Sequence, residues 1–288
     1  MFFCLTAGAG SGEARLHVII DTDAAADDLR AICMLIGNPR IETLAITTSE
    51  GALTPAGAAV KTTELLHHFN IKDIPVGVGR PLCITPPAWR QQSEQIPWGD
   101  GTANTAETTQ PASGLIIQTL EEHNSGVTFL CFGTLTNLND VLTAKPGLKQ
   151  RIERIIWYNS SYSPLKGANY DADTISANKI LAGGMQIDIV SGGGRQEIAI
   201  NEQYIGTIAS LNNRYAEKIA QTHSSGVLKP VTESSHMKMW DDLAVVYLFA
   251  PELFVSENIN AATTINSITA NTSTQIKETA IRILTLNK

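Results

Sequence analysis

Short apolar runs alternate with longer amphipathic stretches along most of the chain. The apolar runs rich in β-branched residues predict strands at 16–20, 43–48, 75–78, 127–132, 154–158 and 187–190. The stretches between and after them carry apolar residues at helical spacing, which predicts helices at 28–36, 54–69, 112–123, 137–144, 172–182, 202–222 and 241–249. This alternation is typical of an α/β fold with a mainly parallel central sheet and helices on both faces.

The composition agrees with one globular unit. The 288 residues are 43% hydrophobic and 17% charged, so we expect residues 15–288 to form a single domain with a large core. Acidic residues outnumber basic ones by 28 to 21, for a net charge of −7, which argues against a nucleic-acid partner. No apolar run approaches the ~20 residues of a membrane helix, so we expect no membrane contact.

The first 14 residues stay outside this fold prediction. Their sequence, MFFCLTAGAGSGEA, fits either the remnant of an export leader or a disordered start. The location of the protein therefore stays open between the cytoplasm and the periplasm or exterior. The cysteines form no C-x-x-C pair, and Cys33 and Cys131 lie in apolar runs that predict core positions.

A run of acidic residues follows the first predicted strand. The segment HVIIDTDAAADD places Asp21, Asp23, Asp27 and Asp28 around the turn at the carboxyl end of that strand, where α/β sheets bind their ligands. Carboxylates packed so closely repel one another unless a cation lies among them, and calcium and magnesium prefer oxygen ligands. Helix capping by Asp27 and Asp28 is the alternative. Because capping explains two acids of the four, the segment predicts a metal site.

A second acidic pair starts the last predicted helix. In WDDLAVVYLFAPELF, Asp241 and Asp242 precede the apolar part of the helix. Taken alone, the pair is typical of a helix N-terminus. A calcium ion needs 6–8 oxygen ligands, however, so Asp241 becomes a candidate ligand for the site predicted at the first turn.

Four segments together resemble the inosine-uridine-preferring nucleoside hydrolase family. HVIIDTDAAADD resembles its D-x-D-P-G-x-D-D motif, and FGTLTNLND resembles its T-G-x-L-T-N segment. SPLKGANYDADTISANKIL resembles T-P-x-A-E-F-N-x-x-x-D-P-E-A-A, and WDDLAVVYLFAPELF resembles H-D-P-x-A-V-A-Y-L-x-x-P-E-L-F. The four matches occur in the order of the family and span residues 16 to about 254.

The resemblance implies a calcium-dependent hydrolase of N-glycosidic bonds acting on a small nucleoside-like molecule. Carried over by position, the metal ligands are Asp23, Asp28, Asp241 and the backbone carbonyl of Phe132. The resemblance also makes Asp23 the catalytic base that takes a proton from the attacking water, and carboxylates would stabilise a cationic sugar-like transition state. It further implies a homodimer or homotetramer.

The positions that would bind substrate follow the family only in part. Asp27 and Asn169 match sugar-contacting residues of the family. The departures from the family motifs are Ala25, Ala52, Trp98, Ser161, Gly167 and Trp240. We expect Trp98 and Trp240 to offer aromatic faces to the substrate and Ser161 to line the pocket. Because Ala52 and Gly167 cannot hydrogen-bond ribose, inosine and uridine are expected to be poor substrates.

Three functions stay open at this point. The first is a glycosidase with a refitted pocket, and the second is a calcium-stabilised ligand-binding relative that no longer turns over, because lost polar contacts erode transition-state stabilisation. The third is a haloacid-dehalogenase-like phosphatase, which also uses D-x-D after a first strand but has no role for Asp27 and Asp28.

His236 is expected to be an exposed loop residue rather than a substitute leaving-group acid.

Overall fold

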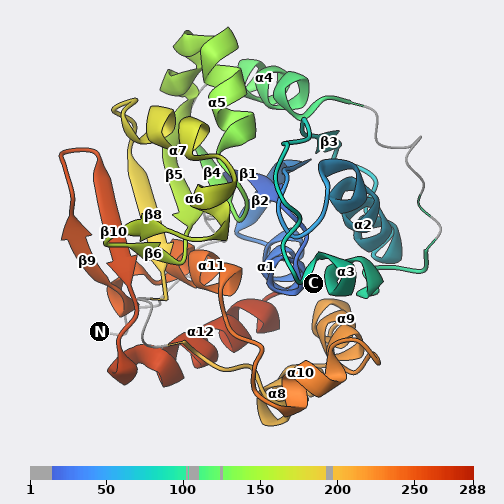
Figure 1. The fold of residues 1–288 in the computed structure, drawn as a ribbon. Helices are drawn as coiled ribbons and strands as arrows, with labels where there is room; N and C mark the ends of the chain where they lie inside the picture. Colours follow the sequence, from blue (N-terminus) through green and yellow to red (C-terminus); the bar gives the residue numbers. More distant parts are fainter. Residues whose placement is uncertain (1–14, 102, 104–109, 124–125, 193–196) are drawn as a thin grey trace, which may run out of the picture.

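The computed structural model describes residues 15–101, 103, 110–123, 126–192 and 197–288 (Figure 1). Its centre is an eight-stranded sheet in the order β3-β2-β1-β4-β5-β8-β10-β9. Neighbouring strands are parallel except the edge pair β10 and β9. The expected mainly parallel α/β fold is therefore confirmed, whereas the prediction for residues 1–14 lies outside the described residues.

The elements follow one another as strand and helix for most of the chain. The strands are β1 (Leu16–Thr22), β2 (Ile41–Thr48), β3 (Val76–Val78), β4 (Val127–Cys131), β5 (Ile152–Tyr158), β6 (Ser161–Tyr162), β7 (Leu165–Lys166), β8 (Ile187–Ser191), β9 (Val255–Asn258) and β10 (Thr263–Ser267). The α-helices are α1 (Ala26–Ile36), α2 (Pro55–His68), α3 (Arg90–Gln95), α4 (Ala112–Glu122), α5 (Thr136–Ala144), α6 (Ala168–Ala172), α7 (Thr174–Leu181), α8 (Glu202–Ala209), α9 (Arg214–His223), α10 (Lys229–Glu233), α11 (Asp241–Phe249) and α12 (Ser273–Thr285).

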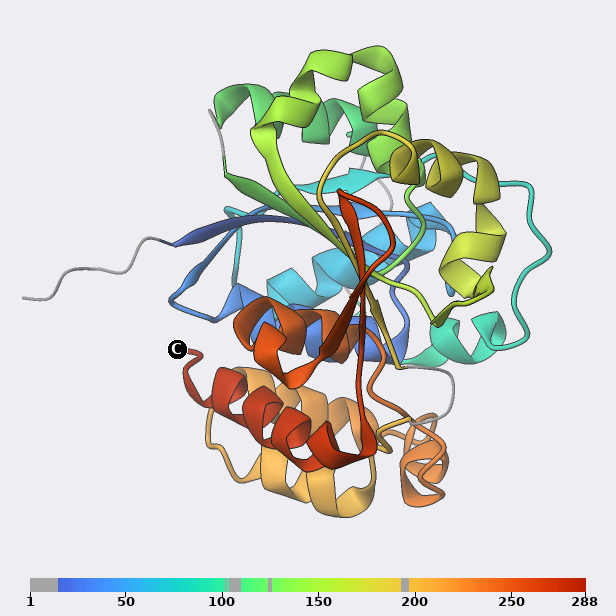
Figure 2. The same ribbon diagram turned by 90° about the vertical axis from the view of Figure 1, so that its left-hand side faces the viewer.

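The sheet separates two apolar cores. Successive strand residues point to opposite faces, so Val18 and Ile20 of β1 join one core and Ile19 joins the other. Helices α1, α2, α8, α9, α11 and α12 cover the first face, and α4, α5 and α7 cover the second. Figure 2 shows this layering, with the green helices on one side of the strands and the orange and red helices on the other. Both faces are buried, which explains why the strands are continuous apolar runs.

Two predicted helices have different bounds in the structure. The stretch 202–222 divides into α8 and α9 because Asn212 adopts a left-handed φ of 51° and the Asn213 side chain caps α9 by accepting from the Ala216 N–H. The helix predicted at 172–182 begins later, as α7 at Thr174, because the Asp173 side chain caps it by accepting from the Ser176 N–H, and the short α6 ends just before it. In both cases a short polar side chain starts a new helix.

Sequence analysis did not predict the two strands at one edge of the sheet. Strands β9 and β10 form an antiparallel pair there, and all four residues of β9 are exposed. The exposed β9 segment, VSEN, has no apolar alternation to reveal a strand. Helix α12 then returns the chain to the first face, beside α1 and α11 (Figure 1). Within the described ranges, no helix has the length and apolar character needed to cross a membrane.

Candidate active site

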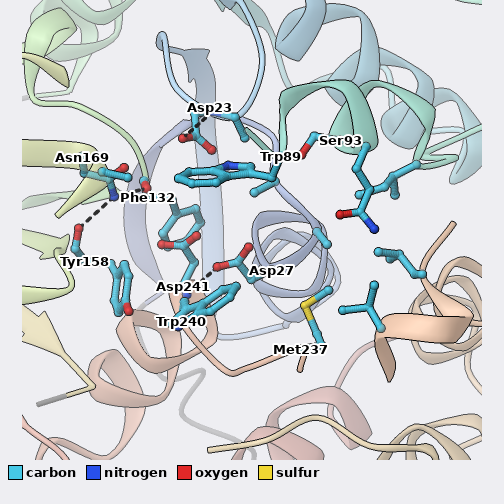
Figure 3. A pocket seen from close by; sticks show the side chains of 18 of the residues that line it. Asp23, Asp27, Trp89, Ser93, Phe132, Tyr158, Asn169, Met237, Trp240 and Asp241 are labelled. Atoms are coloured by element: carbon cyan, nitrogen blue, oxygen red, sulfur yellow. Dashed lines mark hydrogen bonds between the residues drawn. The ribbon is translucent and has the colours of Figure 1, made fainter. Parts of the chain in front are cut away.

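A cavity of about 360 Å³ opens at the carboxyl ends of β1, β4 and β5, next to the start of α11 (Figure 3). Asp23 and Asp27 reach it from the first βα turn, and Asp241 reaches it from α11. Asn169 and Trp240 complete the part of its wall that sequence analysis expected. Residues more than two hundred positions apart in the sequence therefore share one cavity.

The turn between β1 and α1 fixes the position of Asp28. Ala24 has a left-handed φ of 61°, whereas Ala25 has a φ of −73°, so alanine is tolerated without strain at the position where the family motif has glycine. The Thr22 hydroxyl donates to Oδ1 of Asp28, and the Ala25 N–H donates to its Oδ2 at 3.1 Å. This closed turn directs Asp28 towards the start of α11.

Three buried carboxylates meet between α1 and α11. Asp27, Asp28 and Asp241 each offer an oxygen atom, and these atoms lie within 4.8 Å of one another. The backbone N–H of Asp241 donates to Oδ2 of Asp27 at 3.3 Å. Oδ1 of Asp241 is buried and has no hydrogen-bond partner among the described residues. We call Asp27, Asp28 and Asp241 the carboxylate cluster.

Burial makes ionisation of these carboxyl groups costly. It raises the pKa of both Asp28 and Asp241 well above the usual range, and repulsion by the neighbouring carboxylates raises the pKa further. A cation would lower both pKa values and give the unpartnered Asp241 oxygen a partner. An all-oxygen donor set of this kind fits a hard divalent cation, so the cluster could hold a metal ion.

Asp23 lines the same cavity but is held by a different loop. Its Oδ2 accepts a hydrogen bond of 2.9 Å from the backbone N–H of Ala52. A Cβ at Gly51 would overlap the Asp23 carboxylate, so glycine is required for this close approach. Burial raises the pKa of Asp23 to about 7, and the Ala52 N–H opposes that rise. The loop after β2 thus supplies a backbone donor where the family motif has an asparagine side chain.

Asn169 joins the loops that follow β4 and β5. Its Nδ2 donates to the carbonyl oxygen of Phe132 at 2.6 Å and to that of Tyr158 at 3.0 Å (Figure 3). Both amide hydrogens are therefore used within the protein, which leaves Oδ1 as an acceptor for a hydroxyl group. The Phe132 carbonyl, which the resemblance made a metal ligand, is positioned at the cavity by this contact.

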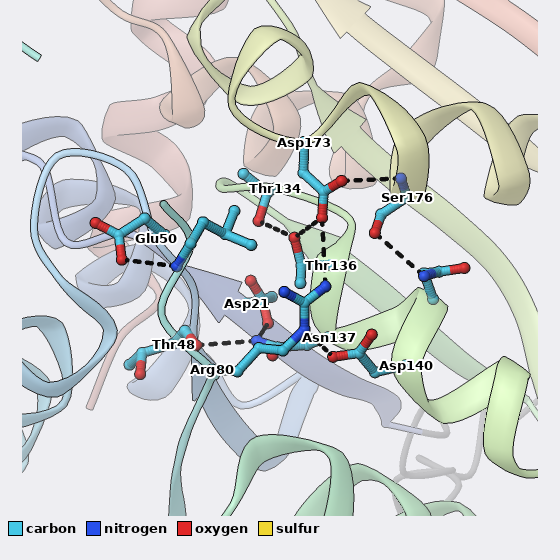
Figure 4. A network of polar contacts seen from close by, with 12 residues as sticks. Asp21, Thr48, Glu50, Arg80, Thr134, Thr136, Asn137, Asp140, Asp173 and Ser176 are labelled. Atoms are coloured by element: carbon cyan, nitrogen blue, oxygen red, sulfur yellow. Dashed lines mark hydrogen bonds and ion pairs between the residues drawn. The ribbon is translucent and has the colours of Figure 1, made fainter. Parts of the chain in front are cut away.

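Asp21 has a different place from the other acids of the first motif. Its Oδ2 accepts from the Thr47 hydroxyl at 2.7 Å. The same oxygen accepts from Nδ2 of Asn137, also at 2.7 Å (Figure 4). Asn137 also donates to the Thr48 carbonyl at 2.9 Å. Burial raises the pKa of Asp21 to about 6. Asp21 thus connects β1 to β2 and α5 beneath the cavity and is not in the carboxylate cluster.

A second part of the polar network in Figure 4 supports α7 and the loop after β3. The Thr136 hydroxyl donates to Asp173 at 2.6 Å, and Asp173 accepts from the Ser176 N–H at 3.0 Å. Arg80 donates to Asp140 at 2.7 Å near the surface. These contacts hold the segments that follow β3 and β4 in a fixed relation to the sheet edge that carries the cavity.

A buried ion pair joins α1 to α11 directly behind the carboxylate cluster. Arg30 donates through Nε and Nη2 to the two oxygens of Asp242, at 2.9 and 2.7 Å, and the side chains are 1% and 3% exposed. Nη1 of Arg30 lies 3.1 Å from Nε2 of His223, whose Nδ1 lies 2.9 Å from the Thr232 hydroxyl. Because arginine only donates, His223 accepts at Nε2 and is neutral. Burial, followed by the Arg30 charge, keeps the His223 pKa well below its usual range.

This pair was not expected from the sequence, where Asp242 looked like a helix cap. Arg30 lies within the apolar pattern of α1, and its partner is 212 positions away. An arginine in a buried stripe is a signal for a buried acidic partner, but it does not identify which acid. The structure shows that the partner is Asp242. The ion pair therefore links α1, which carries Asp27 and Asp28, to α11, which carries Asp241.

Two predicted pocket residues lie elsewhere. Trp98 is 0% exposed and packs in the apolar core on the α1 face, away from the cavity wall. Ser161 lies in the β6–β7 hairpin, where its hydroxyl donates to the Pro164 carbonyl at 3.0 Å. The neighbouring Ser160 lines the cavity instead. The predictions for Trp98 and Ser161 are corrected accordingly, since core packing and a local turn contact determine where these side chains point.

Trp89 is the aromatic residue that sequence analysis missed. It precedes α3, is 47% exposed and lines the cavity together with Trp240 (Figure 3). The next residue, Arg90, donates to Glu50 and to the Gly51 carbonyl, both at 2.7 Å. The available signal in the sequence was an aromatic residue in a segment rich in proline and polar residues, because long loops of this kind often border active sites. His236 is exposed, as expected, and also lines the cavity.

Comparison with known proteins identifies the family. The model of the inosine-uridine preferring nucleoside hydrolases matches residues 18–285. The chain belongs to this family. The non-specific ribonucleoside hydrolase RihC of Klebsiella pneumoniae is 25% identical over 252 residues, which cover 83% of this chain and 81% of that relative. The pyrimidine-specific ribonucleoside hydrolase RihA of Shewanella baltica is 25% identical over 255 residues, with 84% and 80% covered.

The fold comparison agrees with this assignment. The inosine-uridine preferring nucleoside hydrolase of Bacillus anthracis has a TM-score of 0.76 to this chain at 15% identity, over 93% of this chain and 99% of that one. Membership of the nucleoside hydrolase family places the chain among nucleoside N-glycosidases, the enzyme class that the motifs predicted. The phosphatase alternative is therefore dropped. The two relatives differ in base preference, so the family alone does not determine the base for this member.

Proposed function

We propose that this nucleoside hydrolase cleaves the N-glycosidic bond of a nucleoside or related N-riboside with calcium held between Asp23 and two members of the carboxylate cluster, Asp28 and Asp241. The observation that carries the proposal is a cavity that joins Asp23 to a buried group of carboxylates, one of which, Asp241, has an unpartnered oxygen. An arrangement of this kind is costly without a cation. The activity of the ribonucleoside hydrolases that resemble the chain agrees with it.

The proposed metal ligands are Asp23, Asp28, Asp241 and the Phe132 carbonyl. Calcium accommodates such a mixed set of carboxylate and carbonyl oxygens. Bound there, a divalent cation would supply the positive charge that acidifies a water molecule. Asp27, the third member of the carboxylate cluster, accepts from the Asp241 N–H and lines the open cavity, so we assign it to a sugar hydroxyl.

Asp23 is the proposed general base. The Ala52 N–H fixes one oxygen of its carboxylate, so the carboxylate has a single orientation towards the cavity. It would take a proton from the water that attacks the anomeric carbon. As the glycosidic bond breaks, positive charge develops on the sugar, and the surrounding carboxylates stabilise that charge.

The rest of the cavity suggests a refitted substrate pocket. Asn169 offers only its Oδ1 to a sugar hydroxyl, because its amide hydrogens are engaged. Trp240 offers an aromatic face to a leaving base, and Trp89 adds a second aromatic side chain to the wall of the cavity. Ala52 contributes a backbone N–H to Asp23 and no side-chain contact to ribose. Inosine and uridine are therefore expected to be hydrolysed slowly, since polar sugar contacts are fewer.

The decisive experiment measures release of reducing sugar from a panel of nucleosides. The protein is stripped with a chelator and assayed with and without added calcium, beside Asp23→Asn and the surface control Asp140→Asn. We expect calcium-dependent release that falls at least ~100-fold in Asp23→Asn, the usual contribution of a general base, and stays near wild type in Asp140→Asn. Calcium-dependent thermal stabilisation without sugar release from any substrate would instead support the non-catalytic alternative.

A further inference from the structure

A second cavity of about 400 Å³ adjoins the first. It is formed by the loop after β2, the segment 84–89 and helix α6. Ala52, Trp89 and Ala168 line both cavities. The boundary between the two is thus made by two alanines and one half-exposed tryptophan ring, so a ligand in the first cavity can extend into the second.

The position of the second cavity indicates which part of a substrate would enter it. Apolar side chains of the segment 227–240, including Met237 and Trp240, line the part of the first cavity where a base would lie. Asn169 and Met237 lie on opposite sides of Asp241 in Figure 3, and Ala168 is the chain neighbour of Asn169. The second cavity therefore adjoins the sugar side of the site, where the exocyclic 5′ carbon of a ribose is farthest from the base.

The walls of the second cavity define the chemistry of its occupant. The apolar contributors are Ile84, Pro87, Trp89, Ala168 and Ala172. Asp171 is the only charged side chain among the described residues that line it. A phosphate group would meet this carboxylate, the described residues that line the cavity include no lysine or arginine to pair with it, and the net charge of −7 adds to the repulsion. An uncharged apolar group would instead bury its surface favourably against the apolar walls.

We propose that the second cavity binds an uncharged, apolar 5′ substituent of the nucleoside, so that the preferred substrates are 5′-alkylthio or similarly capped nucleosides. This inference rests on the proposed function, because it places the sugar over the carboxylate cluster. It also gives a reason for the small side chains at Ala52 and Ala168: larger ones would close the passage between the cavities. The preference is for the extended substrate over the parent nucleoside.

The test compares three substrates that share one base: the parent nucleoside, its 5′-deoxy-5′-propylthio derivative and its 5′-monophosphate. We expect kcat/KM for the propylthio derivative to exceed that for the parent by at least ~10-fold, mainly through KM, because three buried carbons contribute roughly 2 kcal/mol. The monophosphate is expected to be the poorest of the three. Equal or lower kcat/KM for the propylthio derivative, or the highest value for the monophosphate, overturns the inference.

A variant locates the effect in the second cavity. Ala172 lines this cavity alone, so Ala172→Leu should reduce the ratio of kcat/KM between the propylthio derivative and the parent to about 3 or less. The matched substitution Ala209→Leu, at an exposed position of α8, should keep the wild-type ratio. An unchanged ratio in Ala172→Leu places the substituent elsewhere and overturns the inference.

Equilibrium binding separates this inference from the proposed function. If neither nucleoside is hydrolysed but the calcium-loaded protein binds the propylthio derivative at least ~10-fold more tightly than the parent, the hydrolase function is wrong and the second binding site stands. If the parent is hydrolysed and the derivative gains nothing, the function stands and the second site is wrong. If the protein binds and hydrolyses neither, both are wrong.

Discussion

The floor and the rim of the cavity are built in different ways. The floor, consisting of Asp23 and the carboxylate cluster, is buried and fixed by hydrogen bonds from the turn after β1, the loop after β2 and the start of α11. The rim, which includes Trp89 and His236, stands on short helices and connecting segments and is exposed to solvent. The floor carries the carboxylates that match the family motifs, and the rim carries exposed side chains that those motifs do not predict.

This difference has an energetic consequence. Each floor carboxylate is held in a costly position by buried partners, so a change in the floor affects both the folded state and the reaction. A half-exposed rim residue contributes little to folding, so a change there affects ligand binding alone. The following substitutions test that separation, from the largest expected effect to the smallest.

Removing the positive charge behind the floor should have the largest effect. Arg30→Met leaves the buried Asp242 carboxylate without its partner, which is expected to cost about 3–5 kcal/mol of unfolding free energy. The corresponding fall in the midpoint of thermal unfolding is about 10 °C. Calcium titration followed by thermal shift should also show weaker binding, because α1 and α11 are no longer joined next to the cluster.

Two controls sharpen this result. Arg80→Met removes an exposed pair with Asp140 and should cost less than about 1 kcal/mol. The double variant Arg30→Met/Asp242→Leu removes both charges, so much of the stability should return. If the double variant regains stability and also binds calcium as wild type does, the pair stabilises the fold without positioning the metal site.

Crowding Asp23 should damage the reaction more than the fold. In Gly51→Ala the new methyl group would overlap the Asp23 carboxylate, at a cost of about 1–3 kcal/mol for forced repacking. Because the base moves away from the Ala52 N–H, kcat should fall at least ~10-fold. The matched variant Gly114→Ala adds a methyl group in open space on α4 and should leave kcat unchanged. Equal kcat values for the two variants would show that Asp23 tolerates the displacement.

Because His223 is neutral in the folded protein, the free energy of unfolding should decrease as the pH falls. Folded His223 stays neutral because its pKa is well below the usual range, whereas the unfolded chain binds a proton at this residue below about pH 6.5. The unfolded state then holds more protons, so stability falls as the pH falls, by up to ~1.4 kcal/mol per pH unit. Urea unfolding between pH 7.5 and 5 should show a smaller slope for His223→Gln than for wild type. The exposed His236→Gln should keep the wild-type slope, and a shared slope for all three proteins would refute a neutral buried His223.

The floor was more predictable from sequence than the rim for a physical reason. Asp23, Asp27 and Asp28 are close in the chain and follow a strand, and α/β sheets bring such residues to one edge. Asp241 could be added because a cation requires more oxygens than one turn supplies. Trp98 and Trp89 show what the sequence does not determine. Both are aromatic residues next to α3, and only tertiary packing decides that Trp98 enters the core while Trp89 faces the cavity.

Replacing the rim tryptophan, Trp89, should have the smallest effect, and it should change KM alone. Trp89 is 47% exposed, so Trp89→Ala should leave the thermal midpoint within about 1 °C of wild type. Loss of an aromatic face next to the ligand costs about 1 kcal/mol, which corresponds to a roughly fivefold rise in KM with kcat preserved. Trp89→Phe, which keeps an aromatic face, should recover most of the affinity. A fall in kcat for Trp89→Ala with KM unchanged would mean that the rim takes part in the chemical step, and the division between floor and rim would then be wrong.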